Sequence, residues 1–143
     1  MNVKRLLIAI VAVVAFIWAT DFLIHSVWLM PDYRATAPLW RPEAEMGHYF
    51  VWLLLGQLVW SVMFVTLWAK GFADKARLLC AVMFGLFMGL FFEANTLVAY
   101  FSQPLPGGIA AKWFAANVAQ AVLAGIIVFY TYKCPPPGEV TNK

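Results

Sequence analysis

Apolar residues in this chain are gathered into four long runs, at about residues 6–30, 48–69, 78–101 and 110–132. A helix of about 20 apolar residues spans the roughly 30 Å hydrocarbon core of a bilayer. Backbone groups in lipid must be hydrogen-bonded within one segment or in a closed barrel, and these runs lack the alternation that is typical of barrel strands. The pattern predicts an all-α protein, an integral membrane four-helix transmembrane bundle.

Polar side chains interrupt these runs at a few positions: Asp21, His25, Gln57, Glu93, Asn117 and Gln120. A charged side chain at the bilayer centre costs roughly 2.5–3.5 kcal/mol on insertion scales, so a run that keeps one is expected to give it a partner or a task. Asp21 and Glu93 both lie roughly 5–6 Å from the midplane, toward the same membrane face, at a rise of about 1.5 Å per residue. We therefore expect one intramembrane polar cluster that opens toward that face.

The composition agrees with a membrane protein. Hydrophobic residues make up 64% of the 143 residues and charged residues 12%, against about 45–50% and 25% in soluble proteins. The runs use nearly the whole chain, so we predict one transmembrane domain over residues 1–134 and no separate soluble catalytic domain. Residues 135–143 form a proline-rich tail, because Pro135-Pro136-Pro137-Gly138 cannot continue a helix and favours polyproline II. The expected partner is the lipid bilayer, not nucleic acid.

The basic residues are distributed unevenly between the two sides of the predicted bundle. One side carries Lys4, Arg5, Lys70, Lys75, Arg77, Lys133 and Lys143, and the other carries Arg34, Arg41 and Lys112. Because Lys and Arg concentrate in cytoplasmic loops, both termini are expected in the cytoplasm, and the polar cluster then opens outward. Cys80 and Cys134 fall on the cytoplasmic side, where thiols stay reduced, so no disulfide is expected. The first run has no convincing cleavage site and is expected to remain as a helix.

The connections between the runs differ in length. The outer segment from Pro31 to Gly47 is too long and too aromatic for a minimal turn, and we interpret it as an ordered cap on the membrane. Ser102 to Gly108 holds two prolines and two glycines, which favours a tight extended turn. The inner loop from Lys70 to Lys75 is short, which predicts that the helices on either side of it are antiparallel neighbours.

Small residues recur at helical spacing in the last two runs. Ala81, Gly85 and Gly89 lie four residues apart and lead to Glu93, and Ala121 and Gly125 follow Asn117 and Gln120 on one face of the last helix. Small residues let helices approach closely in lipid, where packing drives association. The pattern predicts a helix-packing seam that keeps Glu93 facing protein.

The polar cluster is compatible with several kinds of site. Asp21, His25, His48 and Glu93 are candidate ligands for a metal ion, and His25 with His48 is a conceivable haem pair. Two carboxylates at similar depth also suit a shared proton or cation, since like charges in a low dielectric disfavour joint ionisation. In the structural alternative, Asp21 bonds His25 or an amide of a neighbouring helix and locks the bundle. No nucleophile elbow, cysteine-pair redox motif or phosphate-binding glycine loop is present.

Four short segments carry a resemblance to a known family. Asp21 and His25, with Phe-Leu-Ile between them, are followed by Leu39-Trp40-Arg41-Pro42-Glu43-Ala44-Glu45-Met46, and Gln103-Pro104-Leu105-Pro106-Gly107-Gly108 with Lys112-Trp113-Phe114 extends the likeness. The chain resembles a family of small four-helix bacterial inner-membrane proteins to which no activity is assigned. The resemblance implies the fold and the bacterial inner membrane as location, and it transfers no site residue.

Two functional hypotheses follow from these patterns. The first is a non-enzymatic accessory or structural subunit of a larger membrane complex, or a homo-oligomer, as small size and small-residue faces indicate. The second is a cation- or proton-linked channel or carrier that uses Asp21, His25 and Glu93, with a metal-binding membrane protein as its variant. Copurification of partners favours the first hypothesis, and ion flux from a lone oligomer favours the second.

Overall fold

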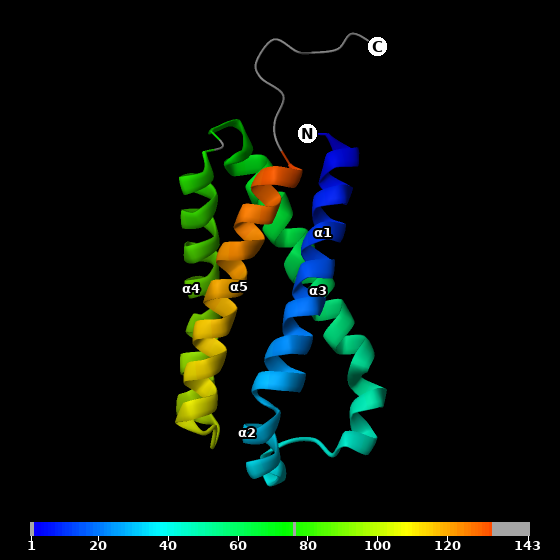
Figure 1. The fold of residues 1–143 in the computed structure, drawn as a ribbon, viewed down its shortest axis with the longest axis vertical. Helices are drawn as coiled ribbons and strands as arrows, with labels where there is room; N and C mark the ends of the chain where they lie inside the picture. The colour runs from blue at the N-terminus through cyan, green and yellow to red at the C-terminus, as the bar shows by residue number, and fades with distance from the viewer. Residues whose placement is uncertain (1, 76, 133–143) are drawn as a thin grey trace.

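The computed structural model describes residues 2–75 and 77–132, and within them every regular element is helical (Figure 1). The elements in chain order are α1 (Val3–Asp21), η1 (Phe22–Trp28), α2 (Met30–Ala35), η2 (Ala37–Leu39), α3 (Glu43–Gly71), η3 (Ala73–Lys75), α4 (Leu78–Ser102) and α5 (Gly107–Thr131). The predicted proline-rich tail and Cys134 lie outside the described residues.

Four helical segments are long and apolar enough to cross a membrane: Val3–Trp28, Glu43–Gly71, Leu78–Ser102 and Gly107–Thr131. Four such helices suit a multi-pass membrane protein and confirm the four predicted helices, and their insertion in a membrane stays a prediction. Three of them, at Val3, Glu43 and Gly107, begin earlier than the apolar pattern predicts, because hydropathy does not mark helix starts. Pro42 precedes α3 and Pro106 precedes α5, and Glu43 and Glu45 place negative charge at the positive end of the α3 dipole.

The apolar run from residue 6 to residue 30 predicts one uninterrupted α-helix, but the first span changes its helix type after Asp21. After Asp21 the chain continues as a π-helix over Phe22–Trp28, and Leu29 N donates to Ile24 O over 2.8 Å. A π-helix bonds residue i to i+5 and turns less per residue than an α-helix. Asp21 is thus the last residue of α1, and His25 lies within the π-helix.

The segment between the first two spans is ordered and mostly helical. Pro31 stands in the first turn of α2, where its missing N–H costs nothing, and η2 follows directly. Tyr33 and Trp40 from this segment pack with Trp113 over Leu105 and the start of α5. The segment is thus ordered, as predicted for a cap. Its contact with a membrane stays a prediction.

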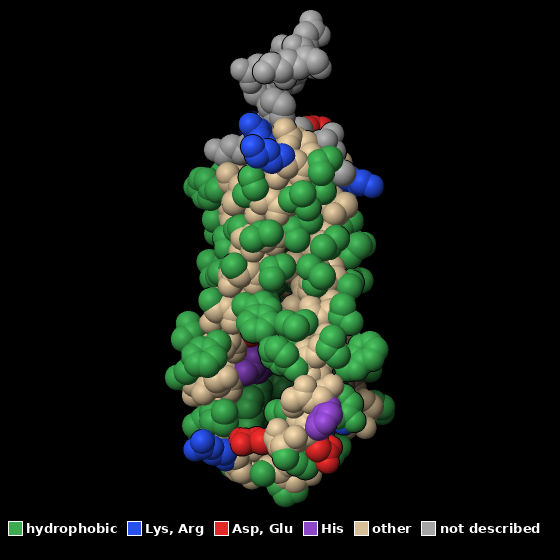
Figure 2. All heavy atoms as spheres, turned by 90° about the vertical axis from the view of Figure 1, so that its right-hand side faces the viewer, with side chains coloured by type: hydrophobic (Ala, Val, Ile, Leu, Met, Phe, Trp, Pro, Cys, Tyr) green, Lys and Arg blue, Asp and Glu red, His purple; other side chains and the backbone are tan. Residues whose placement is uncertain are grey.

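The four spans run alternately up and down, so the two described ends of the chain meet at one end of the bundle (Figure 1). Asn2 N donates to the Tyr132 hydroxyl over 3.3 Å. Basic and acidic side chains appear at both ends of the bundle (Figure 2). The ends of the first and fourth spans are therefore held on the same side.

The closest helix pair is α4 with α5, and glycines make this closeness possible. A Cβ atom placed on Gly85 would lie 2.5 Å from the Ala121 carbonyl oxygen, and one on Gly125 would lie 2.5 Å from the Ala81 carbonyl oxygen. One on Gly89 would lie 3.0 Å from the Val118 Cα atom. Backbone therefore packs on backbone along this seam, as small residues permit between helices.

The helix α3 contributes to the core through only one of its halves. In the half near Gly71, Phe64 and Trp68 are fully buried, and their rings lie 4.8 Å and 5.5 Å from the ring of Phe84 on α4. In the other half every residue from 43 to 56 is exposed. Figure 1 shows this half of α3 diverging from the other helices. Aromatic side chains thus fill one end of the space between α3 and α4, and the other end is open.

Candidate membrane-embedded polar cavity

Glu93 is a buried carboxylate, with 6% of its surface exposed, one helical turn after Gly89 on α4. Asn117 Nδ2 on α5 donates to Glu93 Oε1 over 2.8 Å, and Thr96 Oγ1 donates to Glu93 Oε2 over 2.6 Å. The small residues before Glu93 bring α4 close enough to α5 for the first of these bonds. Both carboxylate oxygens are therefore bonded, and both donors are neutral.

Asp21 forms a second carboxylate centre that joins three helices. Gln57 Nε2 on α3 donates to Asp21 Oδ2 over 2.5 Å, and Gln120 Nε2 on α5 donates to Asp21 Oδ1 over 2.8 Å. Gln120 Nε2 also lies 2.5 Å from the Thr20 hydroxyl oxygen on α1. Of the structural alternatives, the bond to amides of neighbouring helices is the one that forms.

These carboxylates fix the orientation of three amide side chains. An ionised carboxylate only accepts hydrogen bonds, so the nitrogens of Gln57, Asn117 and Gln120 must point toward it. Their side-chain oxygens are then left over. Gln57 Oε1 is buried and has no hydrogen-bond partner among the described residues. Within the same part of the chain, the hydrogen bonds of the other two amides are made by their nitrogens, so acceptors are in surplus here.

A cavity of about 390 Å³ is lined by Glu93 and by Gln57 and Gln120, the two amides that bond Asp21. Its polar wall consists of Gln57, Glu93, Asn117 and Gln120, and its apolar wall includes Trp60 and Phe92. Gly56 and Gly89 also line it and leave room because they have no side chain. Figure 2 shows the surface hollowed on the side where α3 diverges. Four of the six polar residues singled out from the sequence thus share one cavity wall.

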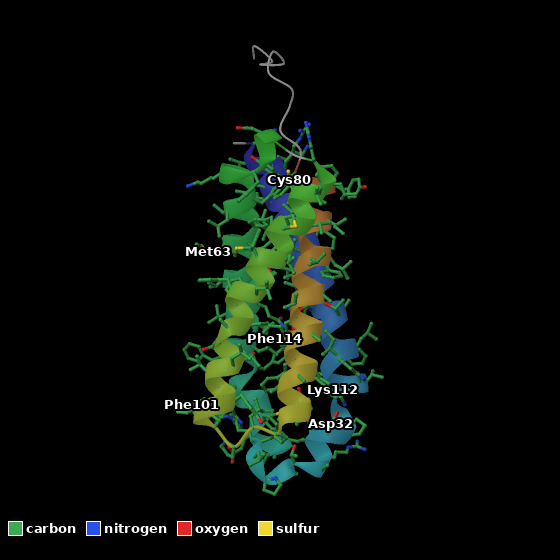
Figure 3. All side chains as sticks on the ribbon, turned by 90° about the vertical axis from the view of Figure 1, so that its left-hand side faces the viewer. Asp32, Met63, Cys80, Phe101, Lys112 and Phe114 are labelled. Atoms are coloured by element: carbon green, nitrogen blue, oxygen red, sulfur yellow. The ribbon has the colours of Figure 1, made fainter. Side chains whose placement is uncertain are left out.

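No basic side chain is hydrogen-bonded to either carboxylate within residues 2–75 and 77–132. The salt bridge in this part of the chain lies outside the cavity, where Lys112 Nζ is 2.7 Å from Asp32 Oδ2. Figure 3 shows these two side chains next to one another at the α2 end. Each is about one-third exposed, so the bridge contributes about 1 kcal/mol or less.

His25 belongs to a different network, at the α2 end of the bundle. Its Nδ1 atom lies 2.7 Å from the Tyr33 hydroxyl, and Trp113 Nε1 donates to the same hydroxyl over 2.7 Å. Burial raises the pKa of Tyr33 above its usual value, although the hydrogen bond from Trp113 acts in the opposite direction. The hydroxyl therefore keeps its proton at neutral pH, accepts from Trp113 and can donate to His25.

The four candidate metal ligands do not gather into one set. Among the described residues no group of three or more His, Cys, Asp and Glu side chains is placed to hold a metal ion. His25 bonds Tyr33, His48 is exposed near the start of α3, and Asp21 and Glu93 accept from different residues. The two carboxylates are thus hydrogen-bonded by amide side chains, and neither histidine is hydrogen-bonded to them.

Some residues of these networks carried little signal in the sequence. Thr96 lies three residues after Glu93 and Thr20 directly before Asp21, so helical spacing could have indicated both. Trp60 carries no distinct signal in the sequence, because tryptophans are common in membrane proteins as interfacial anchors. Tyr33 could not have been found, because its position depends on the π-helix and on α2.

The site therefore combines a buried carboxylate, surplus carbonyl oxygens and aromatic walls around one cavity. Such an arrangement can hold a positively charged or hydrogen-bond-donating group. In comparisons with known proteins, no family model, no curated protein and no solved structure matches the chain.

Proposed function

We propose that this chain is a non-enzymatic, multi-pass membrane protein that binds a cationic species within the bilayer, in exchange for protons, with Glu93 as the counter-ion. The observation that carries the proposal is the Glu93 carboxylate, 6% exposed on the wall of the cavity and bonded only by neutral donors. An uncompensated carboxylate in a low dielectric is costly, so it binds either a proton or a cation. Competition between the two makes cation binding proton-linked.

A carrier or binding protein suits the cavity better than an open channel. Between the cavity and the end where the termini meet, the bundle is filled by fully buried side chains, among them Phe64, Trp68 and Val13. A channel requires a continuous polar path, and this core supplies none along those residues. With both termini in the cytoplasm, as the Lys and Arg distribution favours, the closed side is cytoplasmic. The resemblance to small bacterial inner-membrane proteins adds the bacterial inner membrane as the location.

Glu93→Gln tests the proposal by proton release. Adding Na⁺, K⁺, ammonium or methylammonium to weakly buffered, detergent-purified protein is expected to release protons from the wild type with at least one of these cations, as a pH-sensitive dye reports. The substituted glutamine keeps an acceptor for Asn117 and has no proton to exchange, so release from this variant is expected to fall to that of the detergent alone. The matched control is Glu45→Gln, at an exposed acid near the start of α3. Equal release from wild type and Glu93→Gln would refute the proposal.

A second candidate function is an accessory or structural subunit of a larger membrane complex, or a homo-oligomer. The observation that favours it is the half of α3 over residues 43–56, where every residue is exposed, including Trp52 at 67%. A partner helix would cover this half and close the cavity beside it. Extraction from native membranes in a mild detergent, followed by mass measurement, tests this candidate. A stoichiometric partner or a defined oligomer is its expected result, and a lone monomer contradicts it.

A further inference from the structure

We infer that the cationic species is a small lipophilic primary amine in its ammonium form. Its N–H groups would bond Glu93 and the amide oxygens, and its apolar part would pack on the aromatic wall. This inference rests on the proposed function and narrows it to one ligand class. Three observations carry it: the size of the cavity, the aromatic wall and the surplus of hydrogen-bond acceptors.

The cavity is too large for a bare ion. Its volume of about 390 Å³ falls within the roughly 300–1,000 Å³ that is typical of small-molecule pockets. An alkali cation needs several oxygen ligands at short distance, and most of this cavity is bounded by apolar side chains. No metal-binding group of side chains occurs in the described ranges 2–75 and 77–132 either. The volume therefore fits an organic molecule with a polar head.

The aromatic wall fits a cation with an attached apolar group. The rings of Trp60 and Phe92 lie 5.6 Å apart at 47°, and both side chains line the cavity with Trp52. Aromatic faces attract cations through their quadrupole, and tryptophan does so most strongly. They also bury apolar surface. An ammonium ion on a short apolar chain is attracted by the aromatic faces and also buries its apolar part against them. A metal ion has no apolar part to bury.

The hydrogen-bond acceptors of the cavity wall favour a primary ammonium ion over a quaternary one. A primary ammonium has three N–H donors, and a quaternary one has none. The polar wall offers the Glu93 carboxylate and the side-chain oxygens of Asn117 and Gln120. The nitrogens of these two amides already donate, to Glu93 and to Asp21. Beside them Gln57 Oε1 is buried without a partner among the described residues, which is costly until a donor reaches it. This wall is complementary to a group with several N–H bonds to give.

The open half of α3 gives such a molecule a route from the bilayer. Gly56 lines the cavity, and a Cβ atom built on it would meet nothing within 4 Å. Every residue between Glu43 and Gly56 is exposed, and Figure 2 shows the surface hollowed on this side. An amine with an apolar body concentrates in the membrane interface and can enter sideways. A hydrated metal ion has no comparable access through lipid.

Equilibrium dialysis of radiolabelled 2-phenylethylammonium against the protein in nanodiscs tests the inference, with empty nanodiscs subtracted. We expect saturable binding with one site per chain. The trimethylammonium analogue is expected to bind about tenfold more weakly, because it has no N–H donor. The neutral 2-phenylethanol is expected to show no saturable binding. Equal affinity for all three probes, or binding no greater than in empty nanodiscs, would overturn the inference.

Two variants locate the binding site. Trp60→Leu is expected to weaken 2-phenylethylammonium binding about tenfold, whereas Trp28→Leu, at an exposed tryptophan away from the cavity, leaves it unchanged. Trp60→Phe keeps a ring and is expected to restore most of the affinity, which separates a binding role from a folding role. Binding that does not differ between Trp60→Leu and wild type contradicts this site. If small inorganic cations still release protons through Glu93 while the amine does not bind, the inference fails and the proposed function stands.

Discussion

The double variant Gly85→Ala and Gly125→Ala is expected to lose most of its folded stability in detergent. Each new Cβ atom would lie 2.5 Å from a backbone carbonyl oxygen of the facing helix, and backbone cannot turn aside as a flexible side chain can. The helices α4 and α5 must then move apart. Overpacking of this kind costs about 1–3 kcal/mol for each site. Thermal unfolding followed by circular dichroism should show a large drop in midpoint for the double variant and a smaller drop for each single one.

The matched control for this pair is Gly47→Ala. Gly47 also lies within a helix, but a Cβ atom on it would meet nothing within 4 Å. Replacing glycine by alanine in an open helical position gains up to about 1 kcal/mol through helix propensity. We therefore expect this variant to be as stable as wild type or slightly more stable. If all three glycines respond alike, the cost arises from something other than close approach of α4 and α5.

The seam also positions the candidate site, so its loss should affect binding. Asn117 reaches Glu93 over 2.8 Å only because α4 and α5 are in backbone contact one turn away. A shift of about 1 Å would take this bond beyond the usual range. In single variants that still fold, we therefore expect weaker cation binding together with the lower unfolding midpoint. Packing and function are coupled through this one helix pair.

Much of this architecture could be predicted from the sequence because lipid imposes simple rules. The length of the apolar runs predicts the four long helices. The small residues at every fourth position predict the close packing of α4 on α5. Gln57, Glu93, Asn117 and Gln120 could be assigned to inward faces, since amides and carboxylates avoid lipid. Their meeting at one cavity follows from that avoidance.

Other features depend on contacts between distant segments and leave no local pattern. The stretch Phe22–Trp28 contains neither glycine nor proline, so nothing in it marks a π-helix. The partner of His25 is Tyr33 because the π-helix and α2 bring them together. The exposure of α3 from residue 43 to residue 56 was equally hidden, because an apolar helix in lipid has the same composition whether or not a neighbour covers it.

Asp21→Leu is expected to be strongly destabilising, whereas Asp21→Asn is expected to fold. Leucine removes the acceptor of Gln57 Nε2 and of Gln120 Nε2, and an unsatisfied buried group costs about 1–3 kcal/mol. Asparagine keeps one acceptor for Gln120. Its nitrogen can donate to Gln57 Oε1 once the Gln57 amide rotates by half a turn, so the hydrogen bond between the two side chains is kept with its direction reversed. Thermal unfolding of both variants in the same detergent measures the difference.

The Asp21→Asn variant also separates the roles of the two carboxylates. Asp21 and Glu93 accept from different residues, and Glu93 lines the cavity whereas Asp21 lies behind the amides of Gln57 and Gln120. If Asp21 locks the three helices and Glu93 is the counter-ion, Asp21→Asn keeps cation-dependent proton release and Glu93→Gln loses it. Loss of release in both variants, with the fold intact, would mean that the carboxylates share one proton across the amides. The assignment of the counter-ion to Glu93 alone would then be wrong.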